Sequence, residues 1–387
     1  MVVKYKKTLL LIVFTLLGVA VWPEPALADR LQEAIASAPQ GTEPGQVNPD
    51  AEPGVFGIPG APQINLIVAF FWAIWVGWIF STVGAFGGIM AGVGHITVFG
   101  LGDYASTFKK TSPQLNSIIT DSIRTSNQWM VGLSAAITSF NYWRMGRLVL
   151  PLGGALAVGS IAGSYLIPWL TAGKISLSSY IGYFGLFVLF LGFYLLYEST
   201  PKGQASKKKA KEAAKAFEST IKKQRGGEKV DTSELGVKVR AFSITRIVFT
   251  FYGVEFSFNP LIPVVGGFVI AAIASFLGVG GGFLLVPFLT SVAGLPMYLV
   301  AGTSALAVLI GMMTSIFSYM VGQGTPIYWP MIGIELVGIF VGSMIGPRTS
   351  KFIPDIWLKR IFVILAFYVG IRYASKGFLG TAWLPPF

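Results

Sequence analysis

Apolar stretches of membrane length run through most of this 387-residue chain. About 20 helical residues cross a hydrocarbon core of about 30 Å, and several of these stretches reach that length. Charged residues make up 12% of the chain, about half the share that soluble domains carry. We therefore predict an all-α polytopic membrane protein with about eight transmembrane helices plus broken hairpins. The stretches lie near residues 64–100, 114–141, 148–171, 178–197, 261–293, 298–321, 328–347 and 356–373.

The net charge of +12 is concentrated in one segment. Residues 200–246 carry 13 Lys and Arg against 5 Asp and Glu, which supplies +8 of the total. Because basic segments beside membrane spans stay inside the cell, we predict a cytoplasmic loop at residues 198–246. Its stretch from Lys207 to Lys223 has a helix-forming composition that suits anionic lipid, although a solvated, partly disordered loop is the commoner case. Aromatic residues do not alternate with the lysines, so nucleic acid is not expected as a partner.

The N-terminus has the pattern of a secretory signal. Three lysines within the first seven residues precede a short apolar run, and Ala26-Leu27-Ala28 offers a small-x-small cleavage site. We predict a signal peptide at residues 1–28, with an uncleaved N-terminal anchor as the alternative. Residues 29–63 are rich in Pro, Gly and acidic residues, and we expect them to form a flexible extracytoplasmic lead.

Charge placement and glycine clusters together indicate two repeats of opposite orientation. Four single crossings from an extracytoplasmic start would leave the basic loop outside, against the positive-inside rule. The conflict disappears if residues 64–100 enter the membrane and return as a broken hairpin. A glycine-interrupted stretch opens each half, and inverted repeats with broken helices are typical of secondary transporters. The predicted units are a first repeat at 64–197, a second at 247–375 and a C-terminal tail at 376–387.

A glycine-rich motif in the second repeat supports this class. Gly278-Val279-Gly280-Gly281-Gly282 precedes Phe283-Leu284-Leu285-Val286-Pro287, and Ala301-Gly302-Thr303-Ser304 follows after a Gly-Leu-Pro turn. The pattern resembles the TauE/SafE sulfite exporter family, also called the toluene sulfonate uptake permeases. The resemblance is strong over residues 262–375, weaker over 64–197 and absent from the lead and the basic loop. It implies transport of sulfite, a sulfonate, a sulfoacetate-like acid or a related oxyanion.

One substrate site is predicted where the two repeats meet. Backbone N–H groups at a helix break, with neighbouring hydroxyls, suit the oxygens of an anion. Repeat symmetry matches Arg124-Thr125-Ser126 to Gly302-Thr303-Ser304, so both sets should converge on the pseudo-twofold axis. The alternative is close helix packing, and for Arg124 an ion pair with Asp121. The predicted binding residues are Gly87, Gly88, Arg124, Thr125, Ser126, Gly280, Gly281, Gly282, Phe283, Thr303 and Ser304.

Glu335 is a carboxylate within an apolar stretch. It indicates either proton coupling or a structural hydrogen bond between helices, and both readings stay open. His95 is the only histidine and the chain has no cysteine, so we predict no metal site, cofactor or catalytic residue.

The combined prediction is a multi-pass permease of the inner membrane that moves a small anion by alternating access. Its expected surroundings are the lipid bilayer, with proton coupling and homo-oligomer formation left open. Two alternatives remain, a membrane scaffold or assembly component without transport and a membrane-embedded enzyme. A phosphate-binding Gly-x-x-x-x-Gly-Lys-Ser/Thr string does not occur, which argues against direct use of ATP.

Overall fold

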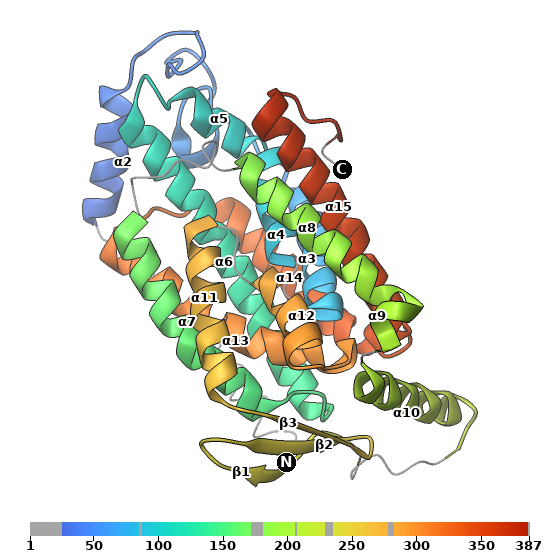
Figure 1. The fold of residues 1–387 in the computed structure, drawn as a ribbon. Coiled ribbons are helices and arrows are strands. Elements are labelled where there is room, and N and C mark those ends of the chain that lie inside the picture. Colours follow the sequence, from blue (N-terminus) through green and yellow to red (C-terminus); the bar gives the residue numbers. More distant parts are fainter. Residues whose placement is uncertain are drawn as a thin grey trace.

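The computed structural model describes residues 25–84, 87–171, 181–205, 207–228, 235–277 and 282–385. It is a helical bundle with a small β-sheet at one end (Figure 1). The elements before the sheet are α2 (Pro25–Ser37), η1 (Val55–Gly57), α3 (Leu66–Val83), α4 (Gly87–Val93), η2 (Gly94–Val98), α5 (Leu101–Thr107), α6 (Pro113–Arg144), α7 (Leu150–Thr171), α8 (Ile181–Ser199), α9 (Pro201–Ala205) and α10 (Lys208–Arg225). The sheet and the second repeat comprise β1 (Lys238–Phe242), β2 (Ile247–Phe251), β3 (Val254–Phe258), α11 (Leu261–Leu277), α12 (Gly282–Pro287), η4 (Phe288–Val292), α13 (Met297–Phe317), η5 (Ser318–Gly322), α14 (Trp329–Ser350) and α15 (Asp355–Leu379).

The all-α polytopic class is confirmed. Within the described part of the chain, five helical segments are long and apolar enough to cross a membrane: Leu66–Val83, Ile181–Ser199, Met297–Gly322, Trp329–Ser350 and Asp355–Leu379. Shorter apolar helices occur in α7, α11 and the two hairpins. Helix α6 is long but carries a row of buried polar side chains, which lowers its hydropathy. Polar residues inside a membrane bundle face its interior, so α6 is a central helix.

The helices pair across the two repeats rather than within them. Helix α3 packs along α14, and α7 packs along α11. The first pair runs parallel, because Gly338 faces the backbone of Phe70 and Gly346 faces Ser81. Two glycines of α7 meet successive turns of α11 in the same order. Missing side chains at these crossings let the backbones approach closely, which is how membrane helices gain packing energy.

Two further pairs lie about the pseudo-twofold axis and run antiparallel. In the α6–α13 pair, Gly302 faces Tyr142 and Gly132 faces Met312. In the α8–α15 pair, the glycine nearest the start of α8 meets the end of α15. Together with the parallel pairs, these directions require each helix of one repeat to run opposite to its counterpart. The structure thus contains the predicted inverted repeats.

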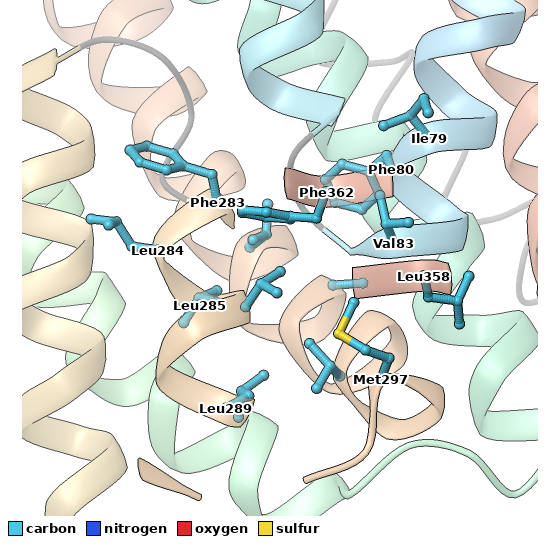
Figure 2. Packing of buried hydrophobic residues seen from close by; sticks show 14 of the residues in the cluster. Ile79, Phe80, Val83, Phe283, Leu284, Leu285, Leu289, Met297, Leu358 and Phe362 are labelled. Carbon is cyan, nitrogen blue, oxygen red and sulfur yellow. The ribbon is translucent and has the colours of Figure 1, made fainter. Parts of the chain in front are cut away.

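Each repeat opens with the predicted broken hairpin. In the first, Gly87 packs on Phe80 and Gly94 packs on Trp72, so α4 and η2 run back along α3. In the second, Gly266 of α11 packs on Phe288 of η4. Around the tip of the first hairpin, apolar side chains from α3, α12, α13 and α15 form one cluster (Figure 2), which includes Phe80, Val83, Leu285, Met297 and Phe362.

The lead differs from the predicted flexible segment. Its apolar side chains are buried against the end of the bundle, and Arg30 donates to the carbonyl oxygen of Gln323 at 2.9 Å. Short turns rich in Pro and Gly direct these apolar side chains toward the bundle without long helices or strands. A composition rich in Pro and Gly therefore did not indicate disorder here. The buried residues include Leu31, Ala34, Val47, Val55 and Ile58. Most of the predicted signal peptide or anchor, residues 1–24, lies outside the described residues.

The basic segment is also folded where the structure describes it. Helix α10 buries Phe217 and three alanines, and β1, β2 and β3 form an antiparallel sheet beside it. The strands β2 and β3 occupy the first residues of the predicted second repeat, so its first membrane helix begins only at Leu261. Lys207 fastens this segment to the bundle by contacting Glu198 and the carbonyl oxygen of Thr290. Burial lowers the pKa of Lys207, and its hydrogen bond to Glu198 opposes that shift.

Candidate functional site

The two predicted Thr-Ser pairs do not converge. Helices α6 and α13 are antiparallel, and Gly302 meets Tyr142 rather than Arg124. Eighteen residues of α6 separate Arg124 from Tyr142, which is about 27 Å along a helix. The predicted single site on the pseudo-twofold axis is therefore corrected: Arg124, Thr125 and Ser126 lie toward one end of the bundle and the second pair toward the other. Residue-by-residue matching missed this because antiparallel helices place equivalent positions on opposite sides of their crossing point.

Packing accounts for Thr303 and Ser304 in this structure. Val149 N donates to Thr303 Oγ1 at 3.1 Å, and Ser304 Oγ donates to the carbonyl oxygen of Ala301 at 3.2 Å. Ser304 Oγ also lies beside Gly84, the residue at the tip of the first hairpin, whose φ of 90° suits glycine. The hydroxyls thus satisfy local groups where a hairpin meets α13.

The other predicted binding residues of the second repeat belong to the glycine-rich motif, Gly280 to Phe283. Gly280 and Gly281 lie outside the described residues. Gly282 borders a small cavity of about 30 Å³ that Gln128 and Ser315 also line. Phe283 is fully buried, edge-on to Phe184 at 5.7 Å, as a core residue would be.

In the first repeat, Gly87 and Gly88 are buried, and a side chain at Gly87 would collide with Phe80. Thr125 donates to the carbonyl oxygen of Asp121, one turn earlier in α6. Ser126 is buried in the same helix. These positions belong to tight packing in this conformation of the protein.

Arg124 lines a cavity into which several polar side chains converge. Its Nη1 donates to Asp121 Oδ1 at 3.0 Å, so the predicted ion pair within α6 is present. The cavity has a volume of about 150 Å³ and lies between η2, α5, α6 and the end of α15. Asp103 and Lys376 form an ion pair on its wall at 2.5 Å. Polar lining is contributed by Asp103, Ser106, Asn116, Thr120, Arg124, Asn127 and Lys376.

Behind the cavity wall lies a buried polar triad that joins three elements. His95 of η2, Asn127 of α6 and Glu335 of α14 are at most 1% exposed. His95 Nε2 lies 2.8 Å from Glu335 Oε2, and His95 Nδ1 lies 2.5 Å from Asn127 Oδ1. Asn127 also lines the cavity, so it connects the His95–Glu335 pair to the space beside Arg124.

The triad has the chemistry of a proton-binding site. Nδ1–H of His95 donates to Asn127 Oδ1, which leaves Nε2 facing the carboxyl group of Glu335. One proton between Nε2 and Oε2 makes the pair neutral overall, whether it sits on the imidazole or on the carboxyl group. Loss of that proton leaves a negative charge in an apolar region, and a second proton leaves a positive charge. Gain or loss of one proton therefore changes the charge of this buried pair by one unit.

The position related to this triad by the pseudo-twofold symmetry lacks the polar pair, although it has the same architecture. Helices α7 and α14 match without gaps, both beginning with a residue followed by Pro. In this register Glu335 corresponds to Leu156, each the seventh residue of its helix. His95 and Leu289 are likewise the second residues of the π-helical turns η2 and η4. Because leucines fill both symmetry-related positions, the fold itself does not require the polar pair. Further identities in this register are Pro151 with Pro330, Gly154 with Gly333, Gly159 with Gly338, Gly163 with Gly342 and Ser164 with Ser343.

Sequence reasoning found Glu335 but missed its partners. A single histidine gave no sign of pairing with a carboxylate 240 residues away, and Asn127 is one of many polar residues on α6. The signal that was present is the α7–α14 register, which marks Glu335 as a polar residue where the other repeat is apolar.

Comparisons with known proteins agree with the membrane fold. The chain matches the family described as sulfite exporter TauE/SafE over residues 69–373. It is 32% identical over 131 residues to a probable membrane transporter protein of Haemophilus influenzae, covering 31% of this chain and 49% of that protein. A probable membrane transporter protein of Methanocaldococcus jannaschii is 32% identical over 130 residues, covering 32% and 48%. The aligned region thus spans about half the length of these relatives.

No solved structure matches the chain. The family match runs from within α3 to within α15 and so includes both hairpins and the triad. By this relationship the chain, a multi-pass membrane protein, belongs to the sulfite exporter TauE/SafE family.

Proposed function

We propose that this protein is a secondary transporter that moves a small oxyanion, such as sulfite or a sulfonate, by alternating access and couples it to protons through His95 and Glu335. The buried pair beside the cavity of Arg124 is the observation that carries this proposal. Burying ionisable groups in a membrane is unfavourable, so such groups mark ion pathways and proton relays.

Arg124 is the group that meets the anion in the cavity. Arg124 carries a positive charge at the wall of the cavity, beside its ion pair with Asp121. An oxyanion arriving beside Arg124 adds a negative charge to a low-dielectric site. A second proton on the His95–Glu335 pair offsets that charge, so anion and proton binding favour each other.

The transport proposal is tested in proteoliposomes that contain the purified protein and a pH-sensitive dye. Sulfite, methanesulfonate, sulfoacetate and acetate are added in turn, and proton movement and anion counterflow are measured. We expect at least one sulfur oxyanion to drive proton movement above the rate in protein-free vesicles. Counterflow without proton movement would leave transport standing and remove the coupling. Absence of both for every anion would contradict the proposed function.

We further propose that the end of the bundle with α10 and the sheet faces the cytoplasm of the cell, with the protein in the inner membrane. The basic charge of this end supports that orientation, since residues 200–246 carry most of the net charge. The lead packs at the opposite end, as Figure 1 shows for α2.

Single cysteines test the orientation cleanly, because the chain contains none. Both Asp50 of the lead and Lys222 of α10 are exposed. We expect an impermeant thiol reagent to label Asp50→Cys in intact cells and to label Lys222→Cys only after permeabilisation. The reverse pattern would overturn the orientation but not the fold.

A further inference from the structure

Arg147 is buried at the end of the bundle that carries α10, and among the described residues no carboxylate forms a salt bridge with it. It follows α6 directly and is 3% exposed. Its Nε donates to the carbonyl oxygen of Tyr298 at 3.2 Å. Nη1 and Nη2 are buried and have no hydrogen-bond partner among the residues that the structure describes. A buried guanidinium normally binds a carboxylate or phosphate through both of these nitrogens.

Aromatic rings surround the guanidinium instead. Its central carbon lies 4.5 Å from the ring centroid of Tyr142, 5.1 Å from that of Phe217 and 5.4 Å from that of Tyr298. Stacking on rings stabilises the positive charge but provides no acceptor for the N–H groups at the edge of the guanidinium plane. The edge of Arg147 therefore keeps its capacity to bind an anion.

The carboxylate that follows Phe217 on α10 bonds to other groups. Glu218 follows Phe217, and its Oε1 accepts hydrogen bonds from Tyr298 Oη at 2.9 Å and from Asp355 N at 3.1 Å. These contacts hold α10 against the starts of α13 and α15. The ring of Phe217, on α10, thus covers Arg147. Glu218, the next residue, holds α10 in this position through its hydrogen bonds.

Arg147 also adjoins the family motif on α13. A side chain at Gly302 would approach Arg147 O to 3.0 Å, and Thr303 Oγ1 accepts from Val149 N. Arg124 lies in the first half of α6 and lines a cavity, whereas Arg147 follows the end of α6 and is closed off from solvent. An alternating-access transporter needs a binding position that is exposed only when the closed side opens.

We propose that Arg147 is a second binding site for the transported oxyanion, reached from the end of the bundle that carries α10, and that Phe217 is its removable cover. This inference rests on the proposed function. It assigns a site that lies outside the cavity lined by Arg124. When α10 moves away, Nη1 and Nη2 bind two oxygens of the anion, and the rings of Tyr142 and Tyr298 remain stacked on the guanidinium. When α10 returns, the anion leaves and the ring of Phe217 closes the site.

The test measures sulfite counterflow from each side of proteoliposomes separately. An impermeant thiol reagent at Lys222→Cys identifies and silences one orientation. Arg147→Gln is expected to raise the half-saturating sulfite concentration at least tenfold from the α10 side and less than twofold from the lead side. Arg147→Lys, which keeps the charge but not the paired donors, should show an intermediate rise on the α10 side. Arg144→Gln is the control, because Arg144 is exposed beside Arg147, and it should change neither value. Equal rises on both sides, or none in a folded Arg147→Gln protein, would overturn the proposal.

A second measurement does not depend on transport. Phenylglyoxal modification of Arg147, read by peptide mass spectrometry, should increase at least fivefold in Phe217→Ala, and sulfite should suppress the increase. If the wild-type protein moves no anion but this protection occurs, the site stands and the transport proposal fails. If Phe217→Ala leaves Arg147 unmodified, or sulfite does not protect it, the covered site is wrong.

Discussion

Replacing Glu335 by Gln is expected to reduce proton-driven anion accumulation by about a hundredfold or more, the usual effect of removing a proton-transfer group. Glutamine keeps the size and one hydrogen bond to His95 but cannot exchange a proton. Anion counterflow without a pH gradient should continue, because it requires no net proton movement. The measurement compares both activities in the same proteoliposomes.

Two variants give this prediction its controls. Ser343 is another fully buried polar residue of α14, bonded to Ser134 at 2.7 Å, and Ser343→Ala should leave proton coupling intact. The double variant His95→Leu and Glu335→Leu reproduces the leucines found at the symmetry-related positions, Leu156 and Leu289. It should fold with equal or greater stability, since apolar replacement of a buried ion pair is often neutral or stabilising by about 1–4 kcal/mol. If proton-driven accumulation persists in a folded Glu335→Gln protein, the His95–Glu335 pair has a structural role and not a coupling role.

Gly342→Ala is expected to destabilise the protein by about 3 kcal/mol or more, or to prevent folding. A methyl group at Gly342 would lie 2.0 Å from the carbonyl oxygen of Ile74, so α14 and α3 would have to separate. Overpacking of this kind commonly costs about 1–3 kcal/mol, and here the obstacle is rigid backbone rather than a flexible side chain. Thermal unfolding of the detergent-solubilised protein measures the effect.

The same helix supplies the matched control for this substitution. A methyl group at Gly333 would meet nothing within 4 Å, so Gly333→Ala should be neutral or stabilising by up to about 1 kcal/mol through helix propensity. Gly163→Ala, at the equivalent position of α7, should resemble Gly342→Ala because its methyl group would lie 2.6 Å from Phe268 O. A Gly342→Ala protein as stable as Gly333→Ala would contradict the close α3–α14 packing.

Part of the candidate site could be predicted and part could not. The Arg124–Asp121 pair was predictable because residues three apart lie on one face of a helix. The carboxylate of Glu335 stood out because charged residues are rare in membrane spans. Its partner His95 could not be found, since their contact depends on how the first hairpin lies against α14. The predicted convergence of the two Thr-Ser pairs failed for a related reason, the antiparallel crossing of α6 and α13.

The sequence by itself determined the membrane class, the helix lengths, the two inverted repeats and their broken hairpins. Each of these follows from local quantities, namely hydropathy over a span, the placement of Lys and Arg, and glycine clusters. Only the tertiary structure decided that helices pair across the repeats, that the lead and the basic segment are folded, and that His95, Asn127 and Glu335 meet. Those features arise from contacts between residues far apart in the chain, where backbone approach at glycines such as Gly338 and Gly342 sets which side chains come together.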